Sequence, residues 1–254
     1  MLPGLLLLAL SSSLSPSLER GDEEFARRQY PLAEAYYDSA LSTSADSADA
    51  LWRLARLYVC MADVAPEDQA LPLYRLAEAY AYRCIQADSM KPEGHTWRAA
   101  AMGNIAMAEG GETKVSLCHA IKRELDCSIG LNPFDDIAHS ILGTFYMALG
   151  GVSWFERQLA AIFLDRLPEG GYEESERALK TAIALAPGII HHHFELGRLY
   201  MEQDRYQEAL EEFRLVGTLP VVLASDERTQ RSAAGFHRNL TVELSNEQDS
   251  NPPD

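Results

Sequence analysis

Residues 193–216 read HFELGRLYMEQDRYQEALEEFRLV, and this stretch decides the fold. Its first half places a Leu-Gly pair and a Tyr on one helical face, and its second half does the same with Ala209 and Phe213. Small residues let two helix backbones approach closely, while aromatic rings fill the space beside them. A polar turn at residues 204–206 separates the halves. The stretch therefore predicts two antiparallel helices that pack together as one unit.

The same spacing recurs along the chain, which indicates a repeat protein. The copies are Leu142-Gly143-Tyr146, Leu54-Ala55-Tyr58, Ala77-Ala81-Cys84, Leu179-Ala182-Pro187 and a degenerate first unit with Gly21, Ala33, Tyr37 and Ala40. Units of this pattern and length resemble tetratricopeptide repeats, in which each repeat buries its apolar face against its neighbours. We therefore expect an all-α, tetratricopeptide-like solenoid of four to five helix-turn-helix repeats.

Two places depart from the regular repeat. Between Tyr58 and Ala77 the spacing predicts a longer loop, which contains Pro66 and Pro72. Residues 150–168 form an amphipathic insertion, which we expect either to prolong the first helix of its unit or to add a helix.

The composition divides the chain into three parts. Residues 1–18 form a signal peptide or short apolar leader, because residues 2–10 are almost all apolar but too few to span a bilayer, which takes about 20. The solenoid covers residues 19–242, and residues 243–254 form an acidic tail that we expect to be disordered. The leader predicts export to the periplasm or the exterior. The alternative is attachment to a membrane by an uncleaved N-terminal segment.

Charge and cysteine usage limit the functions. The formal net charge is -16, which disfavours binding to the phosphate backbone of nucleic acids. The four cysteines show neither a Cys-x-x-Cys pair nor the spacing of a zinc site, so we expect them to pack as small apolar residues. A disulfide between Cys60 and Cys84 stays open as an alternative in an oxidising compartment.

A run of three histidines at residues 191–193 is the main candidate for a metal site. Successive helical residues point about 100° apart, so the three rings cannot all reach one ion. His95, His139 and His193 share one position in their units, three residues before the Leu-small pair or its equivalent. That register favours packing, and we predict neither a metal nor a cofactor.

The acidic pair Asp135-Asp136 is the main candidate for acid–base catalysis. It follows Asn132-Pro133, where helix caps and first-turn acids belong, and we interpret it as a cap. The sequence also lacks a phosphate-binding glycine loop, a Gly-x-Ser-x-Gly motif and a His-Glu-x-x-His motif. We therefore expect a protein that is not an enzyme.

A more specific resemblance rests on the region around the insertion. Its elements are Leu131-Asn-Pro-Phe-Asp135, Ala138-His139, Leu142-Gly143, Ser153-Trp154-Phe-Glu156-Arg157 and Leu167-Pro168. This combination resembles the regulator of microtubule dynamics family, and the leader makes the chain look like a bacterial-type relative. The resemblance implies an α-helical repeat protein without a known catalytic centre, and links to microtubules and organelle contacts in eukaryotic members. We carry over the fold and the binding role, but not the microtubule function.

The insertion also holds a candidate recognition element formed by Trp154, Glu156 and Arg157. In one interpretation, Arg157 forks a carboxylate of a partner. In the other, Glu156 and Arg157 are caps or an ion pair that tie the insertion to the solenoid.

The concave face of the solenoid is the leading candidate for a partner-binding site, because the first helices of such repeats line it. Helical counting from each Leu-small pair places these residues inward: Trp52, Arg56, Thr96, Asn104, Ser140, Thr144, Met147, His191, Phe194, Arg198 and Met201. The sequence thus predicts a non-catalytic scaffold that binds a peptide or partner protein in this groove. The alternative is a carrier of an apolar small molecule or acyl ligand, enclosed by the solenoid and its inserted helix.

Overall fold

The computed structural model of the chain describes residues 15–44, 47–153, 156–157 and 166–250. The regular elements in this part of the chain are all α-helices. They are α1 (Pro16–Ala26), α2 (Tyr30–Thr43), α3 (Ala48–Val64), α4 (Glu67–Ala87), α5 (Pro92–Glu109), α6 (Gly111–Leu131), α7 (Asp136–Gly150), α9 (Tyr172–Leu185), α10 (Ile190–Glu202), α11 (Tyr206–Val216) and α12 (Asp226–Ser250). This confirms the all-α prediction.

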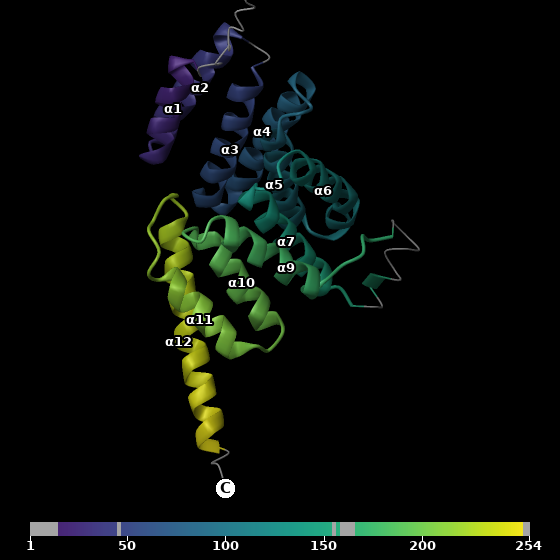
Figure 1. The fold of residues 1–254 in the computed structure, drawn as a ribbon, viewed down its shortest axis with the longest axis vertical. Helices are drawn as coiled ribbons and strands as arrows, with labels where there is room; N and C mark the ends of the chain where they lie inside the picture. The colour runs from purple at the N-terminus through teal and green to yellow at the C-terminus, as the bar shows by residue number, and fades with distance from the viewer. Residues whose placement is uncertain (1–14, 45–46, 154–155, 158–165, 251–254) are drawn as a thin grey trace, which may run out of the picture.

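The helices pack as consecutive pairs, as a repeat solenoid requires. Over the described residues the pairs are α1/α2, α3/α4, α5/α6, α7/α9 and α10/α11, and α12 packs on the last of them. The first helix of each pair also touches the first helix of the next pair, so α1, α3, α5, α7 and α10 form a continuous series (Figure 1). The five pairs confirm the predicted repeat architecture.

Small residues set the close approach within each pair. A Cβ atom at Gly143 of α7 would lie 2.5 Å from Cγ of Leu179 in α9, and one at Gly197 of α10 would lie 2.7 Å from Cε1 of Phe213 in α11. Both distances are too short for a real side chain, so these helices pack this closely only because glycine has no side chain. The Leu-small pairs read from the sequence therefore mark the contacts within each repeat.

The long loop predicted between Tyr58 and Ala77 is not present. Helix α3 continues to Val64, and α4 begins at Glu67 after Pro66. Pro72 lies inside α4, near its N-terminal end, where proline removes only one helical hydrogen bond. The extra residues therefore lengthen two helices instead of a loop.

The insertion does not prolong the first helix of its unit, because α7 ends at Gly150 and Gly151 caps it. The other expectation, an added helix, falls largely on residues 154–155 and 158–165, which lie outside the described residues. The next long helix, α9, begins at Tyr172.

The two ends differ from the predicted boundaries. The apolar leader lies largely outside the described residues, but residues 16–18 belong to α1, whose N-cap is Ser15. At the other end α12 continues to Ser250, so residues 243–250 are helical instead of disordered. Extending an existing helix adds a hydrogen bond for each residue fixed, and this favours continuation of α12. None of the described helices has the length and apolarity needed to cross a membrane.

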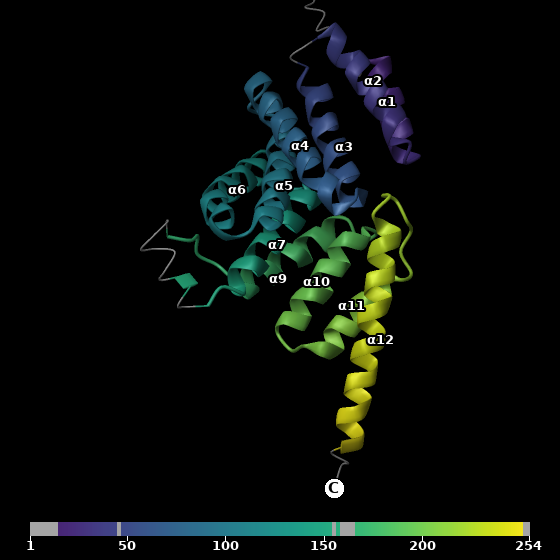
Figure 2. The ribbon, with the colours of Figure 1, turned by 180° about the vertical axis from the view of Figure 1, so that it is seen from behind.

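The solenoid is wound so tightly that its two ends meet. In both views the loop before α12 lies near the lower ends of α1 and α3 (Figures 1 and 2). The backbone N–H of Ala224 donates to the hydroxyl of Tyr30 at 3.2 Å, although 194 residues separate them. The rest of α12 extends away from the body past α11 (Figure 1).

Candidate partner-binding site

Three of the residues predicted to face the groove are buried instead. Thr96, Ser140 and Met147 are 1%, 1% and 8% exposed. The Thr96 hydroxyl hydrogen-bonds to Ser128 and to a carboxylate oxygen of Asp135, both at 2.6 Å, and so joins the pair α5/α6 to the start of α7. Met147 lies in the C-terminal core cluster with Leu179, and the Ser140 hydroxyl is buried. These three side chains are therefore part of the interior and do not line an open groove.

Arg56 and Trp52 belong to a cluster that holds α1 against α3. The guanidinium of Arg56 donates to Asp22 at 3.1 Å and to the Tyr37 hydroxyl at 3.0 Å. It also stacks over Phe25, with 3.8 Å from its central carbon to the ring centroid. Trp52 is half-buried beside it, 5.1 Å away by the same measure. The charge of Arg56 is therefore already balanced within the protein.

Sequence reasoning did not find two members of this cluster, Asp22 and Arg53. Arg53 is buried, and its Nε donates to both carboxylate oxygens of Asp22, at 3.0 and 2.9 Å. Asp22 thus accepts from two arginines of α3. Its position directly after Gly21, at the contact with the next repeat, was the available signal.

The more open part of the predicted face lies on α10. His191 is exposed, and the Arg198 side chain is 45% exposed although it pairs with Glu195 at 2.9 Å. Phe194 and Met201 are half-buried against the C-terminal core cluster, and Phe194 lies 5.9 Å from the Phe213 ring. An exposed cation beside partly exposed apolar side chains is the composition typical of protein interfaces.

The remaining two predicted residues are half-buried on other helices, and their polar groups bond to their own helix. The side-chain amide of Asn104 donates to the carbonyl of Ala100 at 3.1 Å in α5. The hydroxyl of Thr144 donates to the carbonyl of Ile141 at 2.9 Å in α7. The structure therefore spreads the predicted set over several environments, with an open portion on α10.

The three consecutive histidines make separate contacts. His191 is exposed, His192 bonds to Asp136 of α7 at 2.8 Å, and His193 bonds through Nδ1 to Glu212 of α11 at 2.7 Å. Burial lowers the pKa of His192, while the hydrogen bond to Glu212 raises the pKa of His193. Rings that serve different neighbouring helices do not converge on one ion.

His95 repeats the arrangement of His193. Its Nδ1 lies 2.6 Å from Glu124 of α6, and its Nε2 lies 3.0 Å from the carbonyl of Ser89. The Nε2 of His193 lies 3.1 Å from the carbonyl of Pro187, again six residues earlier. A neutral imidazole carries one N–H and can satisfy only one of two acceptors, whereas imidazolium donates to both. In these two repeats the predicted packing histidine bonds to a carboxylate of the second helix, and we call this pair the His-carboxylate clip. His139, in the same register, bonds to the carbonyl of Pro133 at 3.0 Å.

In the described part of the insertion element, Glu156 and Arg157 form hydrogen bonds within the chain. Glu156 accepts from the backbone N–H of Ser153 at 2.9 Å and from its hydroxyl at 2.7 Å, which forms a helix cap. Arg157 donates to the carbonyls of Leu149 and Gly170 and so joins the end of α7 to the segment before α9. Trp154 lies outside the described residues. These contacts match the capping interpretation of Glu156 and Arg157.

The acidic pair also serves as predicted. Asp135 is the N-cap of α7, and its carboxylate accepts from the backbone N–H of Ala138 at 3.0 Å. Asp136 pairs with His192, as described above. The four cysteines are free thiols. Cys60 and Cys84 are buried as predicted, but Cys118 is half-buried and Cys127 is exposed, so the packing prediction is wrong for Cys127. The Cys84 thiol donates to the carbonyl of Ala48 at 3.4 Å.

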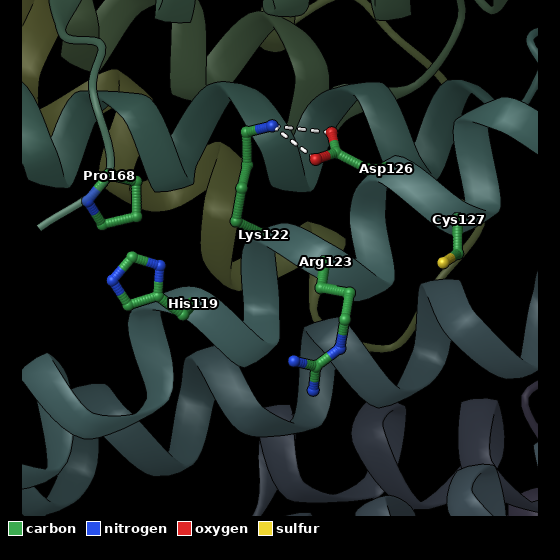
Figure 3. A pocket seen from close by; sticks show the side chains of 6 residues that line it. All are labelled: His119, Lys122, Arg123, Asp126, Cys127 and Pro168. Carbon is green, nitrogen blue, oxygen red and sulfur yellow. Dashed lines mark hydrogen bonds and ion pairs between the residues drawn. The ribbon is translucent and has the colours of Figure 1, made fainter.

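An open pocket of about 480 Å³ lies along α6, beside Pro168 (Figure 3). Its lining is His119, Lys122, Arg123, Asp126, Cys127 and Pro168. Lys122 pairs with Asp126 at 2.6 Å, and His119 bonds to the carbonyl of Arg166 at 2.7 Å, so its polar groups bond largely within the protein. An open pocket of this kind is not the enclosed apolar cavity that a carrier of acyl chains needs.

The described fold is that of a tetratricopeptide solenoid. A solved thermophilic tetratricopeptide protein of Thermus thermophilus superposes with a TM-score of 0.63 at 20% sequence identity, over 87% of this chain and 96% of that one. At this identity the likeness shows the fold alone.

The sequence identifies the family within this class. The profile of the family described as Regulator of microtubule dynamics protein 1-3 matches residues 17–241, and the chain belongs to this family. Human Regulator of microtubule dynamics protein 2 is 26% identical over 188 residues, which cover 73% of this chain and 46% of that protein. Bovine Regulator of microtubule dynamics protein 1 is 24% identical over 227 residues, which cover 88% and 68%. The chain thus spans less than half the length of the human relative.

Proposed function

We propose that this protein is a non-catalytic scaffold that binds an extended polypeptide on the concave face of its solenoid. We call this face, which the first helices α1, α3, α5, α7 and α10 line, the inner face. The observation that carries the proposal is the continuous series of first helices, which ends in α10 with His191 and Arg198 exposed. Stacked repeats present such a face as one elongated surface, which suits an extended chain better than a compact ligand.

The chemistry of α10 indicates what part of a partner it would contact. Nη1 of Arg198 donates to Glu195, and the Nε and Nη2 groups on the other edge of the guanidinium can donate two parallel hydrogen bonds to a carboxylate of the partner. Phe194 and Met201 lie on the same helix and are half-buried, so a partner could cover their remaining apolar surface. We therefore expect a segment with an acidic side chain next to an apolar one.

The name of the relatives describes regulation of microtubule dynamics. Because the chain spans only part of the human relative, we do not carry over microtubules as its target. The apolar residues 2–10 further lead us to propose that the chain is exported, and an intact mass that lacks the leader would test this.

Capture of the partner from the native host tests the proposal. Cross-linking in vivo, followed by protein and lipid mass spectrometry, would compare the wild type with a Trp52→Ala/Arg198→Gln variant. The matched control is Arg177→Ala/Arg231→Ala, which removes exposed side chains from α9 and α12.

We expect one polypeptide that the wild type and the control retain and that the folded Trp52/Arg198 variant loses. Equal recovery with all three proteins would refute binding on the inner face. A stoichiometric lipid without an enriched polypeptide would support the carrier instead.

A further inference from the structure

The loop between α11 and α12 lies against the N-terminal repeats. Leu223 and Ala224 pack against the core cluster that includes Val59 and Cys60 of α3. Trp97 of α5 and Ile141 of α7 pack against the same cluster. The loop therefore lies against the apolar cluster of the N-terminal repeats, on which the first helices of the third and fourth repeats also pack. We call residues 219–227 the strap.

Polar contacts join the strap region to the first two repeats. Besides the bond from Ala224 to Tyr30, Glu227 pairs with Arg28 at 3.5 Å, and the guanidinium of Arg228 donates to the backbone carbonyl of Asp63. The ion pair is exposed on both sides, with side-chain exposures of 42% for Arg28 and 60% for Glu227. Exposed pairs of this kind contribute little to stability, so this pair would not prevent displacement of the strap.

Hydrogen bonds between residues 216 and 230 hold the conformation of the strap. A carboxylate oxygen of Asp226 accepts from the backbone N–H groups of Val222 and Leu223, at 2.8 and 2.7 Å. The side-chain amide of Gln230 donates to the carbonyls of Val216 and Leu219, at 3.1 and 2.9 Å. These bonds lie within residues 216–230, so they persist if the strap leaves the N-terminal repeats.

We propose that the strap is a built-in occupant of the inner face, and that the partner polypeptide displaces it. This inference rests on the proposed function, because it concerns the same face. The surface beneath the strap defines the partner: an apolar cluster, a tyrosine hydroxyl that accepts a backbone N–H, and the cation of Arg28. The partner segment is extended, with two adjacent apolar side chains and an acidic side chain a few residues later.

A peptide that copies the strap tests this mechanism. A fluorescein-labelled peptide of residues 219–230 would be titrated into the full-length protein and followed by fluorescence anisotropy. Leu223→Asp places a charge against the apolar cluster and should release the strap. The matched control is Val222→Asp, which makes the same change at a neighbouring side chain that is 47% exposed.

We expect Leu223→Asp to bind the peptide at least ten-fold more tightly than the wild type or Val222→Asp. Adding Tyr30→Phe to Leu223→Asp should weaken binding again, because it removes the hydroxyl that receives the backbone N–H. Equal affinity of the folded Leu223→Asp protein and the wild type would overturn the proposal.

A surface variant decides the question if Leu223→Asp does not fold. Arg228→Ala removes the donor to the Asp63 carbonyl, and Arg231→Ala removes an exposed arginine three residues further along α12. Arg228→Ala should raise peptide affinity two- to five-fold and speed amide hydrogen exchange in residues 219–226, whereas Arg231→Ala should change neither. Identical behaviour of the two variants would overturn the proposal.

The outcomes separate this inference from the proposed function. If the released variant does not bind the peptide but the wild type still captures a polypeptide that Trp52→Ala/Arg198→Gln loses, only the strap mechanism fails. If no polypeptide depends on Trp52 and Arg198, the proposed function fails irrespective of the peptide result.

Discussion

Gly143 and Gly197 lie where the two helices of a repeat cross, and a neighbouring side chain takes the space that their own would need. Leu179 fills it at Gly143, and Phe213 fills it at Gly197. Gly103 of α5 differs, because a Cβ atom there would meet nothing within 4 Å. At Gly143 and Gly197 the absence of a side chain is needed for packing. At Gly103 it has no packing role, so only the low helix propensity of glycine remains.

Gly143→Ala should lower the free energy of unfolding by about 1–3 kcal/mol, because the added methyl group must displace Leu179. Gly103→Ala should raise it by about 0.5–1 kcal/mol, because alanine favours the helix and meets no neighbour. Urea unfolding followed by circular dichroism measures both. A stabilising effect of Gly143→Ala would contradict the close approach of α7 and α9.

The His95–Glu124 clip should make stability depend on pH. Its hydrogen bond raises the pKa of His95, although burial opposes this. Burial tends to raise the pKa of Glu124. The hydrogen bond from His95 and the charge of Arg98 outweigh this effect, so the pKa of Glu124 lies below its usual value. The contribution of His95 is full below about pH 6.5 and is lost as the pH rises through its folded pKa. The contribution of Glu124 is lost as the pH falls through the folded pKa of Glu124.

A double-mutant cycle of His95→Gln and Glu124→Gln measures this coupling. The coupling free energy should be about 1–3 kcal/mol at pH 6, as for a hydrogen bond between charged groups, and smaller at pH 9, where the imidazole is neutral. Burial lowers the pKa of His192 and makes its contribution change in the opposite sense, so the cycle is needed to isolate one pair. A coupling independent of pH would show that the clip does not require imidazolium.

The histidine register could be predicted from the sequence, but the carboxylate partners could not. Glu124 and Glu212 lie on the second helix of each repeat, and the distance along the chain to their histidine is 29 residues in one repeat and 19 in the other. The two glutamates can be recognised as equivalent only when the three-dimensional repeats are superposed, because their spacing from the histidine differs. Thr96 and Ser140 were misplaced for a similar reason, since helical counting gives the direction of a side chain but not the distance to the next helix.

At the scale of elements, the helices are longer than the repeat pattern predicts. Proline was read as the end of a helix, but Pro66 precedes α4 and Pro72 lies inside it. The apolar positions of α3 and α4 were found correctly, as the complete burial of Ala77 and Ala81 shows. Helix ends depend on capping and on contacts with neighbouring repeats, which repeat spacing does not contain.

Replacement of Pro72 by alanine should stabilise the protein by about 1–3 kcal/mol. The substitution restores a backbone N–H inside α4, and the Pro72 side chain is exposed, so little packing is lost. The midpoint of thermal unfolding should rise accordingly, and Pro31→Ala is the control, because Pro31 lies at the start of α2, where proline is tolerated. A destabilised Pro72→Ala protein would show that the ring makes a contact that matters.

At the scale of the whole molecule, contact between the ends is the feature that the sequence did not reveal. The curvature of a solenoid accumulates from a small rotation at each repeat, and no single motif encodes its sum. The accumulated rotation brings Arg28, Tyr30 and Asp63 into contact with the strap region. The strap covers part of the apolar cluster of the N-terminal repeats, whereas His191 and Arg198 of α10 remain exposed.

Site-specific photo-cross-linking in the native host would show which face binds the partner. A photoreactive phenylalanine analogue would replace either His191 or Arg198 on the inner face, or either Arg177 of α9 or Arg214 of α11, all four of which are exposed. The proposed scaffold predicts the same polypeptide adduct from both α10 positions and none from Arg177 or Arg214. Adducts confined to the α9 and α11 positions, or a lipid as the sole adduct of α10, would contradict it.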